Sequence, residues 1–296
     1  MNVDPPDPAT PIGTTLPRIP RVTIIGAGRV GMTLGRLCRT TGAASIADVL
    51  VRNVDKAAAV IAFIGSGTAV VGYDDLQAAD IYLLTVPDDQ IEACCARLAE
   101  CGLLSGASIV AHCSGAHGTL LLATAVGAGA AVASVHPVRS FADPARVAAS
   151  FAGTLCAIEG DPLALAVLGD LFRALGADLI TIDACNKTLY HAAAVFASNY
   201  LVTLIDVAIQ TYGRAGVGVE DALRMIAPLM RETADNVFRL GPAAALTGPI
   251  ARGDMATVAR QQDALDAVDP AHAALYAQLA AATVALAERR ASGTRS

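Results

Sequence analysis

One glycine pattern constrains the fold of this chain more than any other feature of its sequence. It follows residues 21–25 (RVTII), a mostly β-branched run that predicts a strand, and it precedes a segment with helical periodicity. In the spacing G-x-G-x-x-G, Gly26 permits a tight turn, Gly28 lets a phosphate approach the backbone, and Gly31 lets the helix pack closely on the sheet. Because free N–H groups at a helix N-terminus favour anions, the sequence predicts a dinucleotide-binding βαβ unit. The alternative is a strand-to-helix turn that binds no ligand.

Strand-like and helix-like segments alternate as far as residue 183, which predicts an α/β fold with a mainly parallel sheet. Beyond residue 183 the pattern is helical throughout. We therefore predict a disordered lead-in (1–20), a Rossmann-type domain (21–183) and an all-α domain (184–296). The predicted strands are 21–25, 47–53, 67–73, 80–89, 107–115, 131–141, 153–160 and 177–183. The predicted helices of the second domain are 186–213, 218–240, 254–266 and 270–291.

Composition limits the partners that the chain can have. Of its 296 residues, 54% are hydrophobic and 16% are charged, which is enough apolar material for a core and for a subunit interface. The net charge is −6 and no lysine-rich run occurs, so nucleic acid and anionic membranes are poor partners. We also expect no membrane span, because the most apolar run, 119–135, is interrupted by Gly127 and Gly129.

The cysteines and the proline-rich start point to the cytoplasm. The first 20 residues lack the basic and apolar regions of a signal peptide. The seven cysteines are odd in number and form no C-x-x-C, so we expect neither a disulfide framework nor a metal site. Buried free thiols in a reducing cytosol are the simplest interpretation.

The end of the second predicted strand favours NADP(H) over NAD(H). An acidic residue there would bind the ribose hydroxyls of NAD, whereas this strand ends in Arg52 and Asn53. A guanidinium suits a 2′-phosphate, and Arg29 in the glycine loop adds a second cation. The alternative is that Arg52 is a solvated surface charge. The residues predicted to bind the cofactor are Gly26, Ala27, Gly28, Arg29, Val30, Gly31, Arg52, Asn53, Val86, Pro87, Asp88, Cys113 and Ser114.

Three further polar segments, 85–89, 112–118 and 136–141, lie at the carboxyl ends of predicted strands. In doubly wound sheets, ligands bind beyond the carboxyl ends of the strands. We therefore expect His112, Ser114 and His136 to approach the nicotinamide or the substrate. The alternative for each is a structural role within its loop. No G-x-S-x-G pattern occurs, so the sequence does not indicate the nucleophile turn of an α/β-hydrolase. No H-E-x-x-H pattern occurs either, so it does not indicate the zinc-binding helix of a metalloprotease.

Polar residues also interrupt the apolar segment ACNKTLYHAAAVFASNYLVTLIDVAI (184–209). At about 100° per residue, Lys187, His191 and Ser198 fall on one stripe of a helix, with Asn199 on its flank. Lys187 lies close to the helix N-terminus, where the dipole and burial both lower the pKa of an ammonium group. We therefore predict that Lys187 donates a proton. The alternative is that Lys187 extends to water while the other polar groups bond to backbone.

Together, VTIIGAGRVG, HCSGAHG, HPVRSF, NKTLYHAAAVFASNY and LTGPIARGD resemble a family of Rossmann-like bacterial oxidoreductases whose C-terminal half is a domain of unknown function. The resemblance covers about residues 20–285. This family is similar to the group that contains 6-phosphogluconate dehydrogenase, pyrroline-5-carboxylate reductase and ketopantoate reductase. The resemblance implies a Rossmann domain followed by a helical domain, through which many members of the group form dimers.

The resemblance also implies roles for individual residues. In ketopantoate reductase and the β-hydroxyacid dehydrogenases, a Lys-x-x-x-Asn pair follows the sheet, and its lysine exchanges a proton with the reacting oxygen. The matching residues here are Lys187 and His191, so a histidine stands where those enzymes have the asparagine. Asn199 is the candidate to supply the missing amide group. In LTGPIARGD (246–254), the resemblance makes Thr247 and Arg252 candidates for substrate binding.

We leave two roles open. The substrate carboxylate is assigned to Arg252 or to Arg139. LTGPIARGD is alternatively a turn between helices in which Asp254 is an N-cap.

These observations predict an NADPH-dependent oxidoreductase that reduces the carbonyl group of a small keto acid. The predicted catalytic residues are Lys187, His191 and Asn199, and the predicted substrate-binding residues are Ser114, His136, Ser198, Thr247 and Arg252. By family analogy alone, 2-dehydropantoate is the first substrate to consider. The alternatives are an imine reductase of the pyrroline-5-carboxylate type, a prephenate-type dehydrogenase, and a non-catalytic NADP sensor. We expect a cytoplasmic homodimer, associated through the helical domain, that acts on a small carboxylate.

Overall fold

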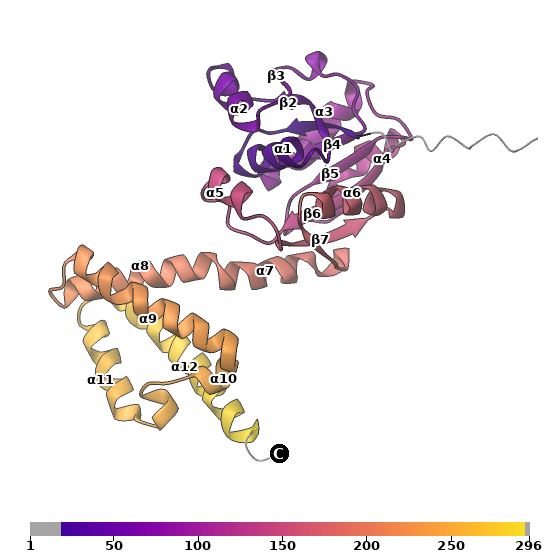
Figure 1. The fold of residues 1–296 in the computed structure, drawn as a ribbon. Coiled ribbons are helices and arrows are strands. Elements are labelled where there is room, and N and C mark those ends of the chain that lie inside the picture. Colours follow the sequence, from indigo (N-terminus) through magenta and orange to yellow (C-terminus); the bar gives the residue numbers. More distant parts are fainter. Residues whose placement is uncertain (1–18, 294–296) are drawn as a thin grey trace, which may run out of the picture. The chain divides into compact units, whose positions relative to one another are not determined.

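The computed structural model describes residues 19–293, with side chains from 19 to 290, and divides into two compact units (Figure 1). The sheet unit runs to Val195 and the helical unit begins at Phe196, later than the predicted boundary at 183. Apart from its last two residues, the predicted disordered lead-in (1–20) lies outside the described residues.

The sheet unit contains an eight-stranded sheet with the order β3-β2-β1-β4-β5-β6-β7-β8. Neighbouring strands pair in parallel, except that β6 and β7 are antiparallel. The strand order reverses between β1 and β4, which creates the topological switch point where doubly wound sheets bind ligands. The predicted α/β fold with a mainly parallel sheet is confirmed. The strands are β1 (Arg21–Ile25), β2 (Ser45–Leu50), β3 (Thr68–Val70), β4 (Ile81–Leu84), β5 (Ile109–His112), β6 (Ala131–Pro137), β7 (Leu155–Gly160) and β8 (Asp178–Thr181).

Helices cover both faces of this sheet, because its central strands carry apolar side chains on both sides. From β1, Val22 and Ile24 pack into the apolar cluster of one face, and Ile25 packs into that of the other. The first face is covered by α1 (Arg29–Thr41), α2 (Ala57–Ile64), α5 (Pro144–Ala149) and α6 (Pro162–Ala174); the second is covered by α3 (Ile91–Glu100) and α4 (Ala123–Gly127). Short 3₁₀ helices lie at Val54–Lys56, Tyr73–Asp75, Asp88–Gln90, Thr119–Leu122, Ala184–Asn186 and Ile250–Arg252.

The remaining chain is helical, as the sequence predicts. The long predicted helix 186–213 is divided at Ser198, whose backbone angles (φ −123°, ψ −66°) leave the helical region. Ser198, which was predicted to share a stripe with Lys187 and His191, therefore does not continue the same helix. The helices are α7 (Lys187–Ala197), α8 (Asn199–Arg214), α9 (Val219–Leu240), α10 (Pro242–Ala245), α11 (Met255–Asp266) and α12 (Pro270–Gly293).

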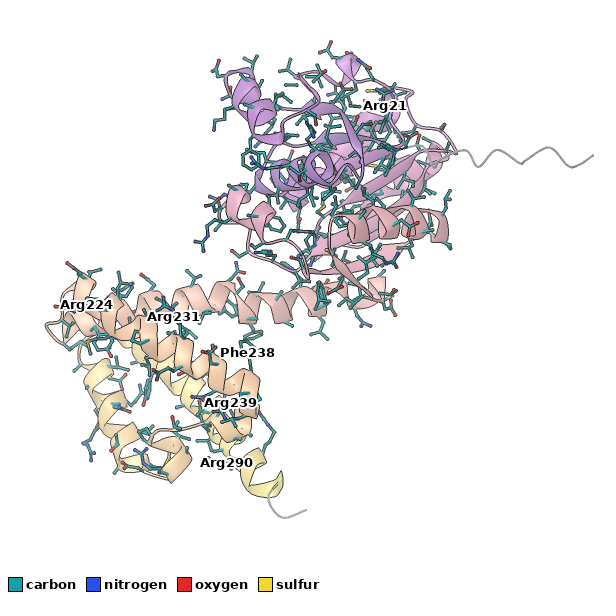
Figure 2. The ribbon with its side chains drawn as sticks, viewed as in Figure 1. Arg21, Arg224, Arg231, Phe238, Arg239 and Arg290 are labelled. Atoms are coloured by element: carbon teal, nitrogen blue, oxygen red, sulfur yellow. The ribbon has the colours of Figure 1, made fainter. Side chains whose placement is uncertain are left out.

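The helical unit has a small core and a large exposed apolar surface. Among its described residues, the buried side chains are Ala222, Ile226, Val258 and Ala273. In contrast, Phe238 on α9 is 87% exposed (Figure 2). This surface is the kind that commonly contacts another subunit.

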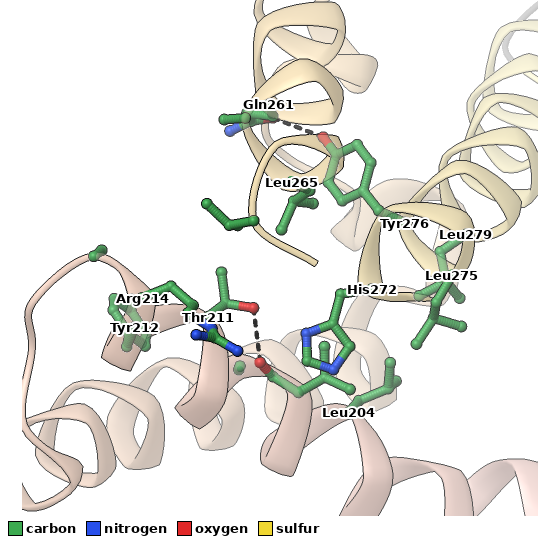
Figure 3. A pocket seen from close by; sticks show the side chains of 15 residues that line it. Leu204, Thr211, Tyr212, Arg214, Gln261, Leu265, His272, Leu275, Tyr276 and Leu279 are labelled. Atoms are coloured by element: carbon green, nitrogen blue, oxygen red, sulfur yellow. Dashed lines mark hydrogen bonds between the residues drawn. The ribbon is translucent and has the colours of Figure 1, made fainter. Parts of the chain in front are cut away.

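A groove of about 610 Å³ opens between α8, α11 and α12 (Figure 3). The Tyr276 hydroxyl donates a hydrogen bond of 2.7 Å to Gln261, and His272 lies 3.5 Å from Asp269. Because these polar groups are paired, the groove presents mainly hydrocarbon.

The run Ala184–Arg214 has a mean hydropathy of 1.7 and is long and apolar enough to cross a membrane, by length and composition alone. The sequence expectation concerned uninterrupted apolar runs, and this run contains Lys187, His191 and Asp206, so the two statements do not conflict. One such helix is weak evidence for a span, because core helices pass the same test.

Candidate functional site

The backbone of the glycine turn has the geometry that the sequence predicts. Gly26 has a φ of 101°, which side chains disfavour. A Cβ on Gly31 would lie 2.4 Å from the Gly26 carbonyl oxygen, so only glycine permits this close helix–sheet contact. A Cβ on Gly28 would meet only the Thr85 carbonyl oxygen, at 3.8 Å, so this residue borders open space. No side chain caps the N-terminus of α1 at Gly28, which leaves N–H groups for an anion.

A cleft of about 480 Å³ runs along this turn. Seven of the predicted cofactor residues line it: Gly26, Ala27, Gly28, Arg52, Asn53, Val86 and Pro87. Of the other predicted cofactor residues, Gly31 is buried beneath the turn, and Asp88 and Ser114 lie further along the sheet edge. The prediction missed Lys56, Tyr73, Thr85 and Gln90, among others, because these residues reach the cleft from loops and helix ends.

Two cations border the cleft beyond β2. Arg52 and Lys56 are both exposed, and Lys56 ends the 3₁₀ helix that follows Arg52. The Asn53 carbonyl oxygen Oδ1 accepts a 2.8 Å hydrogen bond from the Asp55 N–H, so this side chain caps that short helix. No Asp or Glu lies among the described residues that line the cleft. This end of the cleft therefore suits a phosphate better than a neutral diol.

His112, at the end of β5, shapes the loop 112–118. Its Nε2 lies 3.2 Å from the Gly118 carbonyl oxygen, and its Nδ1 accepts a 3.2 Å hydrogen bond from the Ser114 N–H. The two contacts place the proton on Nε2. Burial lowers the pKa of His112 from 6.5 to about 4, so the ring is neutral near pH 7. His112 thus holds the loop from inside, which is the structural alternative to contact with a ligand.

Ser114 joins the loops after β4 and β5. Its hydroxyl donates a 2.9 Å hydrogen bond to Asp88 and accepts hydrogen bonds from the N–H groups of Ala116 (3.1 Å) and His117 (3.2 Å). The side chain is buried, so these contacts saturate it. Two residues predicted to bind the cofactor, Asp88 and Ser114, are thereby brought together at the expected edge of the sheet.

Lys187, the first residue of α7, is 1% exposed. Its Nζ donates hydrogen bonds to the Ser134 hydroxyl and to the Ser114 carbonyl oxygen (3.0 Å), and it lies 3.7 Å from Glu159 Oε1. Glu159 also accepts hydrogen bonds from the Thr119 N–H (3.1 Å) and hydroxyl (3.3 Å). Burial lowers the pKa of Lys187, and the Glu159 carboxylate opposes that shift. We call Lys187, Ser134 and Glu159 the lysine anchor.

Strand pairing explains why the anchor exists. His112 is paired with Ser134 across β5 and β6, and Ser134 is paired with Glu159 across β6 and β7. Paired residues on adjacent strands point to the same face, so the ammonium group meets a polar row. Ser134 and Glu159 are not among the predicted site residues. Their signal was a polar residue within each of two otherwise apolar strands.

A second polar group surrounds Gly115. His136 Nδ1 lies 2.9 Å from the Tyr190 hydroxyl, and the rings of His136 and His191 are 5.8 Å apart. A Cβ on Gly115 would lie 2.5 Å from His191 Nδ1 and 2.8 Å from His136 Nε2. His191 Nδ1 is buried and has no hydrogen-bond partner among the described residues. Two residues that the sequence predicts separately thus converge on one glycine, Gly115, which is not among the predicted site residues.

The other predicted site residues are placed as follows. Arg139 donates hydrogen bonds to Ser150 and, at 3.1 Å, to Thr154, so its guanidinium is engaged within its own loop. The Asp254 carboxylate caps α11 by accepting a 3.1 Å hydrogen bond from the Thr257 N–H, as the structural alternative for its segment predicts. Ser198, Asn199, Thr247 and Arg252 are exposed residues of the helical unit, and their functional roles stay predictions.

Comparison with solved structures shows what this fold is similar to. A protein from Bacteroides fragilis, provisionally described as an NADP oxidoreductase, is 20% identical with a TM-score of 0.75, over 90% of this chain and 98% of the other. A Thermotoga maritima protein is 24% identical with a TM-score of 0.70, and the match covers 90% of this chain and 98% of the other. A Myxococcus stipitatus imine reductase in complex with NADP⁺ is 15% identical with a TM-score of 0.62, over 93% and 95%.

Enzymes with other substrates share this fold. They include a pyrroline-5-carboxylate reductase from Coxiella burnetii (TM-score 0.58, 16% identity) and a prephenate dehydrogenase from A. aeolicus (TM-score 0.56, 14% identity). At these identities the likeness shows the fold alone.

Sequence comparison separates the two parts of the chain. No curated protein matches it. A model of a Rossmann-like domain matches residues 5–137, and a model of a domain of unknown function, DUF2520, matches residues 154–283. The chain therefore joins a Rossmann-like domain to a DUF2520 domain, as the resemblance in its motifs implies.

Proposed function

We propose that this chain is an NADP(H)-dependent oxidoreductase. The observation that carries the proposal is the cleft along the glycine turn. One part of this cleft is formed by the uncapped N-terminus of α1, which would bind the pyrophosphate. Another part is formed by Arg52 and Lys56, which would bind the 2′-phosphate. Three of the similar folds support this cofactor, since they are described as NADP enzymes or as NADP complexes.

Replacing the two cations tests this proposal. Each charged hydrogen bond to the phosphate contributes about 1.5–3 kcal/mol, so Arg52→Ala or Lys56→Ala should weaken NADPH about tenfold or more. NADH lacks this phosphate and should bind nearly as before. Fluorescence titration of both nucleotides measures the ratio, with the exposed Arg39→Ala on α1 as a matched control. Equal weakening of NADPH and NADH would remove the assignment of these residues to the 2′-phosphate.

For the reaction, we propose reduction of a small keto acid, with 2-dehydropantoate as the first substrate to assay. This choice rests on the resemblance of Lys187 and His191 to the Lys-x-x-x-Asn pair. The proposal that Arg252 binds the carboxylate likewise rests on resemblance. Imine reduction and prephenate-type dehydrogenation stand beside it, because enzymes of both kinds share this fold.

The surroundings of Lys187 favour an anchoring role over proton donation. Its ammonium group has three protons, and Ser114, Ser134 and Glu159 offer an acceptor for each. A proton donor must reach the reacting atom, whereas this group is 1% exposed. We therefore propose that Lys187 positions the loop that contains Ser114.

A non-catalytic NADP sensor is the alternative from another class. It predicts tight NADPH binding with no turnover on keto acids, cyclic imines or prephenate. Turnover of any one of them, measured as NADPH oxidation or NADP⁺ reduction, rejects the sensor.

We further propose a cytoplasmic homodimer that associates through the helical unit. The supporting observation is the apolar surface of that unit, on which Val202 is 68% and Phe238 is 87% exposed. Burying large apolar side chains of this kind is the main driving force of subunit association.

A further inference from the structure

Asp88 presents a carboxylate beyond the carboxyl end of β4, directly after Pro87, which lines the cofactor cleft. Its Oδ2 accepts the 2.9 Å hydrogen bond from the Ser114 hydroxyl. Ser114 is buried, whereas the Asp88 side chain is 45% exposed. This bond therefore fixes the position of a carboxylate that solvent or a ligand can still reach.

The order of the strands indicates which half of the cofactor would lie near this carboxylate. The sheet runs β2-β1-β4-β5, and a dinucleotide crosses such a sheet at the switch point between β1 and β4. Arg52 and Lys56, which would bind the 2′-phosphate of the adenosine half, follow β2. The pyrophosphate would lie over the glycine turn after β1. The nicotinamide half would therefore extend to the other side, where the loops after β4 and β5 carry Asp88 and Ser114.

Three buried groups face Asp88, and none of them cancels its charge. From α7, the Lys187 ammonium group lies 3.7 Å from Glu159 Oε1, so these two opposite charges offset each other. From β5 and β6, His112 and His136 face Asp88 as neutral rings near pH 7, because burial lowers the pKa of each from 6.5 to about 4. The negative charge of Asp88 is therefore not neutralised from inside the protein.

His117, in the loop after β5, also faces Asp88 and is half-exposed. Its Nε2 lies 3.9 Å from Asp88 Oδ2. An imidazolium at this distance would offset the carboxylate, whereas a neutral imidazole would not. Measurement at about pH 8, at the upper limit of the range in which imidazole groups ordinarily titrate, takes this charge out of the comparison.

We propose that Asp88 makes this site selective for the redox state of the cofactor, by strengthening the binding of NADP⁺ relative to NADPH. This inference rests on the proposed oxidoreductase function. The nicotinamide ring of NADP⁺ carries one positive charge, and it loses this charge when it accepts a hydride, which is a proton with two electrons. A fixed carboxylate at the nicotinamide end attracts the charged ring and has no such attraction for the neutral one.

The consequence is a bound cofactor that is a stronger reductant than the free one. A residue that strengthens the binding of the oxidised form lowers the reduction potential of the bound couple. For a two-electron couple, a tenfold preference corresponds to about 30 mV. Asp88 therefore biases the proposed reaction toward reduction, whether the substrate is a keto acid or an imine.

Asp88→Asn tests the charge while keeping the contact, because an asparagine carbonyl oxygen can accept the same hydrogen bond from Ser114. We expect the Kd for NADP⁺ to rise about five- to tenfold at about pH 8, because water screens a half-exposed charge only in part. The Kd for NADPH should stay within about twofold, because its nicotinamide ring is neutral. Isothermal titration calorimetry of the full-length protein with each nucleotide measures both constants.

Asp89→Asn is the matched control. Asp89 belongs to the same 3₁₀ helix, Asp88–Gln90, but its carboxylate accepts a hydrogen bond from Gln90 rather than from the loop after β5. The control removes an equal charge from the same helix N-terminus, so an effect of the helix dipole or of net charge appears in both variants. We expect Asp89→Asn to change both Kd values by less than about twofold.

Two further variants make the test independent of one substitution. Asp88→Glu keeps the charge, so the ratio of the two Kd values should stay close to that of wild type. Asp88→Ser removes the charge and serves if Asp88→Asn does not fold, with the same loss expected.

The possible results separate this proposal from the proposed function. Selective weakening of NADP⁺ in Asp88→Asn, absent from Asp89→Asn, supports it. Equal weakening of both nucleotides, no weakening of either, or the same result in Asp89→Asn overturns it. Failure of the wild-type protein to bind either nucleotide would instead overturn the proposed function itself.

Discussion

Acid should destabilise the sheet unit through His112, whose ring is fully buried and neutral in the folded protein. Its pKa is 6.5 when exposed and falls to about 4 on folding, because burial penalises the charged ring. Between these values the unfolded chain binds a proton that the folded chain does not. Stability from this residue is therefore fully present above pH 6.5 and is lost as pH falls toward 4. Linkage gives a loss of about 2 kcal/mol between about pH 7.5 and about pH 5.

A non-titrating substitution isolates this effect. His112→Gln keeps an N–H near the position of Nε2, so it can still donate to the Gly118 carbonyl oxygen. Urea unfolding of wild type and variant should show that wild type loses about 2 kcal/mol more than the variant over this pH range. His117→Gln is the matched control, because the side chain of His117 is 48% exposed. If wild type and His112→Gln lose the same free energy, His112 is protonated in the folded protein and the reasoning fails.

Two further predictions concern the lysine anchor and the helical unit. Lys187→Met leaves the buried Glu159 without its cation and should cost about 3–5 kcal/mol in urea unfolding; Lys187→Met/Glu159→Gln should recover part of it. If the double variant also regains turnover, proton donation by Lys187 is excluded. If Lys187→Met alone unfolds at the same urea concentration as wild type, the anchor itself is refuted. Phe238→Glu places a charge where an 87% exposed aromatic ring stands, so it should shift a dimer toward monomer in light scattering, whereas Glu288→Gln should not. A wild-type monomer would remove the proposed dimer.

The features that the sequence predicts well are local in the chain. The glycine turn, its strand and its helix lie within residues 21–41, and their chemistry depends on neighbours that the spacing already specifies. The helices after residue 183 are likewise recognisable from periodicity, and Asp254 is recognisable as a cap from its position before an apolar run. In each case the interaction that determines the structure connects residues within a few turns of each other.

The lysine anchor could not be predicted in this way. Lys187 meets Ser134 and Glu159 only because β7 pairs antiparallel with β6, and that reversal has no local signature. The prediction that Ser198 lies on one stripe with Lys187 and His191 was wrong for a related reason. It assumed a constant rotation per residue along one unbroken helix, and the helix is interrupted at Ser198. Lys56 reaches the cleft from a 3₁₀ helix, whose position depends on the fold rather than on the motif.

The lysine anchor and the polar group around Gly115 are connected through α7 and the loop 112–118. Lys187 and His191 are one helical turn apart, so both project from the same side of α7. Lys187 donates a hydrogen bond to the carbonyl oxygen of Ser114, the residue that precedes Gly115. A single ammonium group therefore fixes both the loop that contains Gly115 and the helix that carries His191. Because a displacement of about 1 Å at such a site can cost a hundredfold in rate, a buried lysine without contact to substrate can still determine turnover.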